Sequence, residues 1–141
     1  MPIAQAVMSA EPPRILLVED DATFAAFMME RLRQLGYAAE WVKDGGRAEA
    51  HLRDRPCDLL IVDLALPDVE GLSLLAELKR GGLLGKAAVV VLTGRFSASD
   101  VERATRLGVE EYVAKPFNED AFFGRLAELT SLSGGPSALL F

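Results

Sequence analysis

The sequence predicts an α/β fold: a doubly wound, five-stranded parallel sheet with helices on both faces. Short aliphatic runs, such as RILLV at 14–18 and DLLIV at 58–62, have the pattern of strands buried on both faces. These runs alternate with segments in which apolar residues recur at helical spacing. Such alternation is typical of βα crossovers, which join parallel strands.

The elements of the first half follow in order after the strand at 14–18. A helix is expected over 22–35 with Gly36 as its C-terminal stop, and a weaker strand at 38–42 is expected at the sheet edge. Asp44 can cap a short helix that runs to about Asp54. The first helix has residues at helical spacing that should form its inner face: Phe24, Phe27, Met28, Arg31, Leu32 and Leu35.

The second half continues the alternation from the strand at 58–62. A helix over 70–80 should end at Gly81-Gly82, and the aliphatic run at 87–92 predicts the fourth strand. The remaining elements are a helix that starts at Ser97 or Ser99 and ends at Gly108, a strand at 111–114, and a last helix capped by Asn118 with Phe122, Leu126 and Leu129 inward.

The 141 residues amount to about one domain, with 50% hydrophobic and 26% charged residues. We divide them into an N-terminal arm (1–13), the domain (14–130) and a C-terminal tail (131–141). The net charge of −6 and the lack of a Lys/Arg cluster argue against direct nucleic-acid binding by this chain. One cysteine, Cys57, excludes an internal disulfide. Because no signal peptide or membrane span is visible, we expect a cytoplasmic protein.

Polar side chains stand at the ends of four of the five expected strands. Glu19 and Asp20 follow the first strand, Asp63 the third, Thr93 the fourth and Lys115 the fifth. The carboxyl ends of the strands form the ligand crevice of an open α/β sheet. Clustered carboxylates are unfavourable unless they take up protons or bind a cation, and oxygen ligands suit Mg²⁺. A carboxylate can also attack phosphorus, while a lysine and a hydroxyl stabilise phosphate oxygens.

In this order the motifs resemble the receiver domain of two-component response regulators, which has the chemotaxis-regulator-like fold. The spacings match the family: 30 residues from Asp63 to Thr93 and 22 from Thr93 to Lys115. The resemblance covers about 14–130 and implies the flavodoxin-like strand order 2-1-3-4-5. The motifs that carry it are Val18-Glu19-Asp20, Ile61 through Asp63 to Pro67 with Gly71 beyond, Val91-Leu92-Thr93-Gly94, and Tyr112 through Lys115-Pro116 to Phe117.

The resemblance implies a role for each site residue. Asp63 would be the phosphoacceptor and a metal ligand. Asp20 would bind Mg²⁺ directly, Glu19 through water, and the backbone carbonyl of Ala65 would supply a further oxygen. Asp21 would be left for the start of the first helix, where its charge suits the helix dipole.

Other residues would respond to the phosphoryl group. Thr93 would bind it and shift toward it, and Lys115 would pair first with Asp63 and then with phosphate. Tyr112 would be the switch aromatic that turns inward into space vacated by Thr93. Pro116 would follow a cis peptide bond. Many family members have a polar side chain where Ala65 stands, and Arg95 stands two residues after Thr93; these positions are associated with phosphoryl lifetime.

The function implied is a signalling switch, phosphorylated on Asp63 by a sensor histidine kinase or a phosphotransfer protein and catalysing only its own phosphorylation and dephosphorylation. An alternative is an aspartyl-phosphate-type small-molecule phosphatase, but its usual second acid is replaced by Ala65. A flavodoxin-like nucleotide or flavin module would need a Gly-, Ser- or Thr-rich phosphate loop where the acidic triplet stands.

Two expectations concern surfaces and output. Charged residues on the fourth helix, fifth strand and fifth helix form either a solvated face or a charge-paired homodimer surface. About ten residues follow the last helix, so we expect output through contact with another protein or through a region outside this sequence. The charged residues are Arg103, Arg106, Glu110, Glu111 and Arg125.

Overall fold

The computed structural model describes residues 11–130, and it contains one parallel sheet in the strand order β2-β1-β3-β4-β5. This order confirms the predicted fold class, including the edge position of the second strand. Nearly all of the predicted N-terminal arm and the whole predicted C-terminal tail lie outside the described residues.

The secondary structure follows the predicted alternation, with boundaries shifted by one or two residues. The strands are β1 (Arg14–Val18), β2 (Ala38–Val42), β3 (Leu59–Val62), β4 (Ala88–Thr93) and β5 (Glu111–Ala114). The helices are α2 (Ala22–Gln34), α3 (Gly45–Asp54), α4 (Gly71–Arg80), α5 (Ala98–Arg106) and α6 (Glu119–Thr130).

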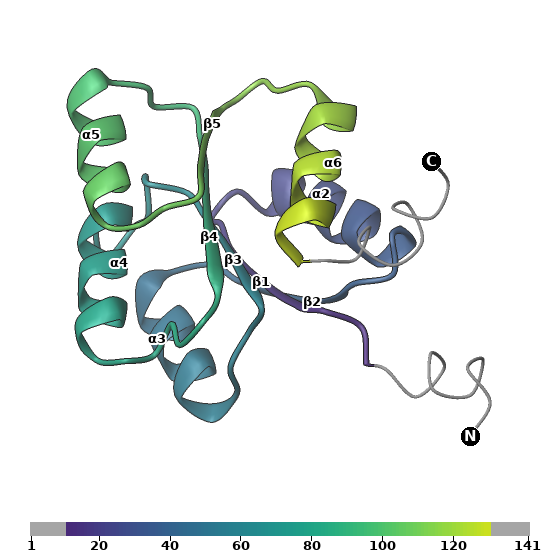
Figure 1. Cartoon of the computed structure of the whole chain (residues 1–141), viewed down its shortest axis with the longest axis horizontal. Coiled ribbons are helices and arrows are strands. Elements are labelled where there is room, and N and C mark those ends of the chain that lie inside the picture. The colour runs from purple at the N-terminus through teal and green to yellow at the C-terminus, as the bar shows by residue number, and fades with distance from the viewer. Residues whose placement is uncertain (1–10, 131–141) are drawn as a thin grey trace.

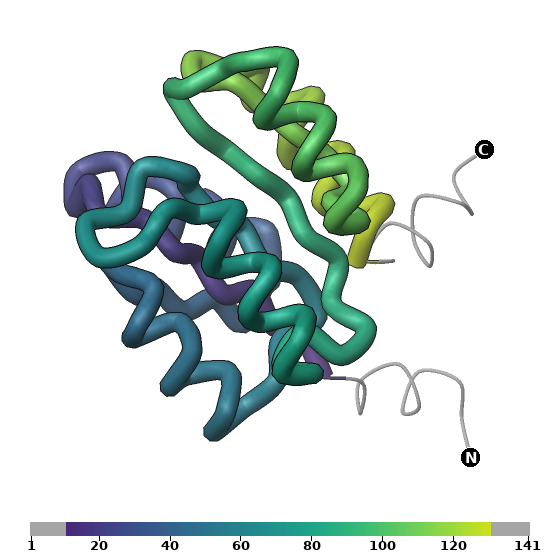
Figure 2. Tube along the Cα trace, turned by 90° about the vertical axis from the view of Figure 1, so that its left-hand side faces the viewer, coloured from purple at the N-terminus to yellow at the C-terminus, as the bar shows by residue number. Residues whose placement is uncertain are grey.

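Helices cover both faces of the sheet, so its central strands are buried on both sides. Figure 1 shows α2 and α6 on one face and α3, α4 and α5 on the other. Alternate residues of β1 divide between the two cores: Ile15 and Leu17 pack toward α2 and α6, whereas Leu16 and Val18 pack toward α3 and α4. The tube in Figure 2 shows α3, α4 and α5 side by side in front of the sheet. Burial on both faces explains the continuous aliphatic runs.

One prediction about the inner face of α2 is partly wrong. Phe27 and Leu35 are 37% and 40% exposed, although both were placed on that face. The buried positions Ala25, Met28, Met29 and Leu32 instead form a narrow stripe at i, i+3, i+4 and i+7. Phe27 lies off this stripe, whereas Leu35 continues its spacing but follows the last residue of the helix, Gln34.

Capping residues fix the helix starts at the same end of the sheet as the polar strand ends. The Asp21 carboxylate accepts the backbone N–H groups of Thr23 and Phe24, as expected for the acid assigned to the helix start. Ser97, rather than Ser99, caps α5. Among residues 11–130, no helix has both the length and the apolar composition that crossing a membrane requires.

Candidate functional site

Three carboxylates converge at the carboxyl ends of β1 and β3. Glu19, Asp20 and Asp63 each offer an oxygen, and these oxygens lie within 4.8 Å of one another. Val18 of β1 pairs with Val62 of β3. The next residue of each strand, Glu19 and Asp63, therefore lies beside its counterpart. Glu19 and Asp63 are only 2% and 7% exposed, while Asp20 is exposed.

Lys115 brings a single positive charge to this cluster, and with the three acids it forms what we call the acidic site. Its Nζ lies 2.8 Å from Glu19 Oε1 and 3.5 Å from Asp63 Oδ2. The resemblance implied a pairing with Asp63, but the shorter contact is with Glu19. Burial raises the pKa of Glu19, and the hydrogen bond from Lys115 opposes that rise without cancelling it. Lys115 and Pro116 are joined by the expected cis peptide bond.

Hydrogen bonds between backbone and side-chain groups hold the acidic residues in place. Glu19 accepts the N–H of Asp21 at 3.2 Å, and its carbonyl oxygen accepts the indole N–H of Trp41 at 2.6 Å. Asp63 Oδ1 accepts the N–H of Ala65 at 3.2 Å. A side chain at Gly71 would place its Cβ 2.6 Å from the Asp63 carbonyl oxygen, so glycine allows α4 to begin this close to the end of β3.

Thr93 and Tyr112 are connected through the backbone of one residue, Arg95. The buried Thr93 Oγ1 accepts the Arg95 N–H at 3.2 Å, and the Tyr112 hydroxyl donates to the Arg95 carbonyl oxygen at 2.7 Å. The Tyr112 ring packs edge-on against Phe96, with 5.7 Å between centroids. Burial raises the pKa of Tyr112, which favours the protonated hydroxyl that donates to Arg95.

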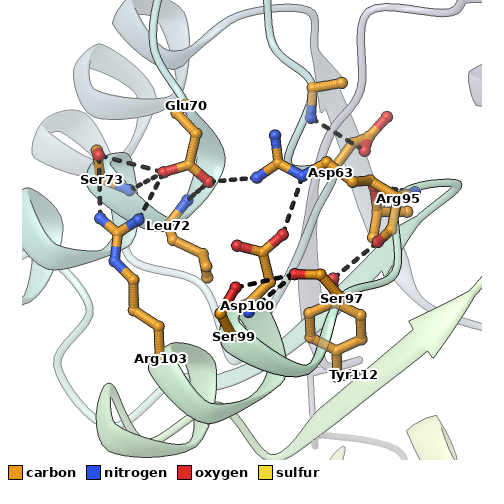
Figure 3. Close-up of polar contacts among 12 residues, drawn as sticks. Asp63, Glu70, Leu72, Ser73, Arg95, Ser97, Ser99, Asp100, Arg103 and Tyr112 are labelled. Atoms are coloured by element: carbon orange, nitrogen blue, oxygen red, sulfur yellow. Dashed lines mark hydrogen bonds and ion pairs between the residues drawn. The ribbon is translucent and has the colours of Figure 1, made fainter.

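A network of four charged side chains flanks this loop, and we call it the arginine clamp: Glu70, Arg95, Asp100 and Arg103 (Figure 3). Arg95 reaches Glu70 at 2.9 Å and Asp100 at 3.0 Å, and Arg103 reaches Glu70 at 3.0 Å. Beyond the unusual cation at Arg95, the sequence did not indicate this network, because Glu70 lies 25 residues before Arg95 and 33 residues before Arg103.

The charged residues considered for a homodimer surface have partners within the chain. Arg106 pairs with Glu102, Arg125 pairs with Glu111, and Glu110 accepts the backbone N–H of Val89. Arg103 belongs to the arginine clamp. A charge-paired contact between two copies would therefore involve groups that already have partners within the chain.

The acidic site fits a hard divalent cation. Its ligands are carboxylate oxygens, which Mg²⁺ prefers, and the carboxylates outnumber the single lysine that contacts them. Burial disfavours the charged form of Glu19 and so raises its pKa, and a bound cation would stabilise that charged form. An exposed Asp20 leaves the cluster open to solvent on one side, as an ion that keeps several waters requires.

The family model of the response regulator receiver domain matches residues 15–127. The chain therefore belongs to the response regulator receiver domain family, as the strand-end residues indicated. A crystal structure of a receiver domain protein from Methanospirillum hungatei, described as CheY-like, is 26% identical with a TM-score of 0.78, covering 88% of this chain and 98% of that one. The non-phosphorylated receiver domain of HemR from Leptospira biflexa is 37% identical with a TM-score of 0.76, covering 84% and 94%.

Among curated proteins, the response regulator protein PmrA of Pseudomonas aeruginosa is 38% identical over 122 residues, which cover 86% of this chain and 54% of PmrA. The phosphate regulon transcriptional regulatory protein PhoB of Rhizobium meliloti is 31% identical over 114 residues, covering 81% and 50%. The chain thus spans about half the length of these relatives.

Proposed function

We propose that the chain is the phosphoacceptor switch of a two-component phosphorelay, in which Asp63 receives a phosphoryl group from a histidine kinase or a phosphotransfer protein. The observation that carries the proposal is the placement of Asp63 beside two further carboxylates and Lys115 at the carboxyl edge of the sheet. Membership of the receiver family favours this function over a small-molecule phosphatase or a flavin module.

The transfer itself requires little chemistry from the chain. An Asp63 carboxylate oxygen forms a bond to phosphorus while the phosphorus–nitrogen bond of the donor phosphohistidine breaks, and the bonding electron pair leaves with the imidazole. Lys115 reduces the repulsion between Asp63 and the incoming phosphoryl oxygens, and the Thr93 hydroxyl can donate to one of them.

Mg²⁺ would be held by Asp20 and Asp63, with Glu19 acting through water and Ala65 through its carbonyl oxygen. When bound, the ion neutralises charge that builds up between Asp63 and the phosphoryl group. The protein's own part is to hold three carboxylates close together, and Lys115 and the Asp21 N–H support this at Glu19.

The output follows from the loop and helix next to Thr93. We propose that phosphorylation changes the surface formed by the β4–α5 loop, α5 and β5, because Thr93 and Tyr112 both contact the Arg95 backbone. Relatives that the chain matches over about half their length are named as transcriptional regulators. We therefore propose a cytoplasmic role in transcription control, exerted through residues or a partner outside this sequence.

Phosphorylation by a small donor tests the proposal. Incubation with acetyl phosphate and Mg²⁺ should add one phosphate to the intact chain, measured by mass spectrometry, and Asp63→Asn should abolish the addition. Asp58→Asn is the matched control, because Asp58 precedes the same strand at its opposite end, where it accepts the Arg14 N–H. Persistent labelling of Asp63→Asn would show that another residue is the acceptor.

A further inference from the structure

The arginine clamp lies where the phosphoryl site meets the proposed output surface. Arg95 is held at three places: its N–H by Thr93, its carbonyl oxygen by Tyr112, and its guanidinium by two carboxylates. Thr93 and Tyr112 are the two residues expected to respond to phosphorylation. The hydrogen bond of Thr93 and that of Tyr112 therefore both depend on the position of the Arg95 backbone.

The guanidinium is fixed from two different helices (Figure 3). Its Nη2 donates to Glu70 Oε2 at 2.9 Å, and Glu70 is the N-cap of α4. Its Nε donates to Asp100 Oδ2 at 3.0 Å, in the first turn of α5. Because the guanidinium is planar and its donors have fixed directions, contacts on two sides define its orientation as well as its position.

Glu70 is itself held firmly, which makes it a good anchor. Its carboxylate accepts the backbone N–H groups of Leu72 and Ser73 at 3.1 Å each, and Arg103 donates to it at 3.0 Å. Arg103 also donates to Ser73 Oγ at 3.1 Å. The anchor is therefore tied to the backbone of α4, and it does not depend on flexible side chains alone.

Stability is a weak explanation for these contacts. Arg95 and Arg103 have side chains that are 45% and 42% exposed, and ion pairs this exposed contribute little to the free energy of folding. Their main effect is geometric, because they join the start of α4, the loop after β4 and the first turn of α5 into one unit.

We infer that Glu70 and Asp100 are positioning residues, which act through Arg95 to couple Thr93 to Tyr112. With the clamp closed, the two backbone contacts of Arg95 move together, so a displacement of the Thr93 hydroxyl is passed on to Tyr112. With the guanidinium released, the loop adjusts locally and the two contacts become independent. The inference rests on the phosphoacceptor role proposed for Asp63 and adds to it the route by which the signal leaves the site.

A double-mutant cycle on the intact chain tests whether Tyr112 and the clamp act through the same residue, Arg95. Tyr112→Phe removes only the hydroxyl that donates to Arg95, and Asp100→Asn removes one anchoring charge without changing the shape of the side chain. The measured quantity is the rate of phosphorylation by acetyl phosphate with Mg²⁺. The two effects should be non-additive by about threefold or more, as coupled residues are. Glu70→Gln in place of Asp100→Asn should give the same result.

The matched control is Arg106→Gln, which breaks an ion pair with Glu102 on the same helix, outside the clamp. This variant should be additive with Tyr112→Phe within about twofold. Hydrogen exchange gives a second readout, because the Arg95 N–H donates to Thr93 Oγ1. Its exchange should become about tenfold faster in Asp100→Asn and stay unchanged in the control.

The outcomes separate the inference from the function on which it rests. Additivity of Tyr112→Phe with both Asp100→Asn and Glu70→Gln overturns the positioning role, as does unchanged exchange of the Arg95 N–H in Asp100→Asn, and either result leaves Asp63 as the acceptor. If the unsubstituted chain takes up no phosphate, the proposed function is wrong, and the inference that rests on it is wrong as well. Circular dichroism melting identifies any variant whose fold is lost, and the alternative anchor variant then decides the cycle.

Discussion

The acidic site and the arginine clamp are two charged regions that lie at the same edge of the sheet but differ in charge balance. In the acidic site, three carboxylates lie together and one lysine contacts two of them. In the clamp, two carboxylates meet two arginines, and every member has an oppositely charged partner. Both regions connect elements that are distant in sequence.

The difference is visible in two glutamates. Burial raises the pKa of Glu19, and its contacts with Lys115 and the Asp21 N–H do not offset this. Burial also acts on Glu70, but hydrogen bonds from Leu72 and Ser73, together with the charge of Arg103, outweigh it and lower the pKa. A region left short of positive charge favours binding of a cation. A balanced region needs no ligand, and its contacts serve to fix geometry.

The largest effect should come from removing the only lysine of the acidic site. Lys115→Met should slow phosphorylation by acetyl phosphate about 100-fold, because the incoming phosphoryl group then meets carboxylates without the charge that offsets them. Rates would be measured by mass spectrometry over time, with exposed Lys86→Met as the control. A rate for Lys115→Met within about threefold of the unsubstituted chain would mean that Lys115 does not offset the charge of the carboxylates during phosphorylation.

A second experiment divides the acidic triplet. Asp20→Ala should weaken Mg²⁺ binding about 100-fold, since it removes a proposed direct ligand, and should not destabilise the fold. Asp21→Ala should leave Mg²⁺ binding within about twofold but lower the free energy of unfolding by about 1 kcal/mol, since Asp21 caps α2.

The single tryptophan supplies the readout for this pair. Trp41 donates its indole N–H to the Glu19 carbonyl oxygen, so its fluorescence should change on Mg²⁺ titration. Urea unfolding followed by circular dichroism gives the stability of each variant. Equal losses of Mg²⁺ affinity in the two variants would show that the two acids do not have separate roles.

The fold and the acidic site were accessible from the sequence because both depend on regular patterns. Aliphatic runs mark buried strands, and strand ends in a parallel sheet meet at one edge, so Glu19 and Asp63 could be placed at that edge without coordinates. The family resemblance supplied the strand order that makes them neighbours. The inner face of α2 was harder, because Phe27 is apolar and near the stripe, yet lies outside it.

The clamp could not be predicted, and the reason is physical. Arg95 and Glu70 are 25 residues apart and Arg103 and Glu70 are 33 apart, and no periodicity relates such positions. A long charged side chain on a surface can pair with any of several neighbours, so composition does not determine which pairs form. The sequence therefore left Arg103 as a solvated or intermolecular charge, whereas the structure bonds it to Glu70.

The smallest expected effect tests whether the clamp is a geometric device or a stability element. Arg103→Gln should lower the free energy of unfolding by less than about 1 kcal/mol, because the lost pair is partly exposed and Glu70 keeps its two backbone donors. Urea unfolding at low salt and at 1 M salt should show the loss shrinking as charges are screened. A loss above about 2 kcal/mol that persists in salt would instead indicate a desolvated charge left unpaired. The clamp would then resemble the acidic site in its energetics, and the distinction between a region that binds a ligand and one that fixes geometry would no longer hold.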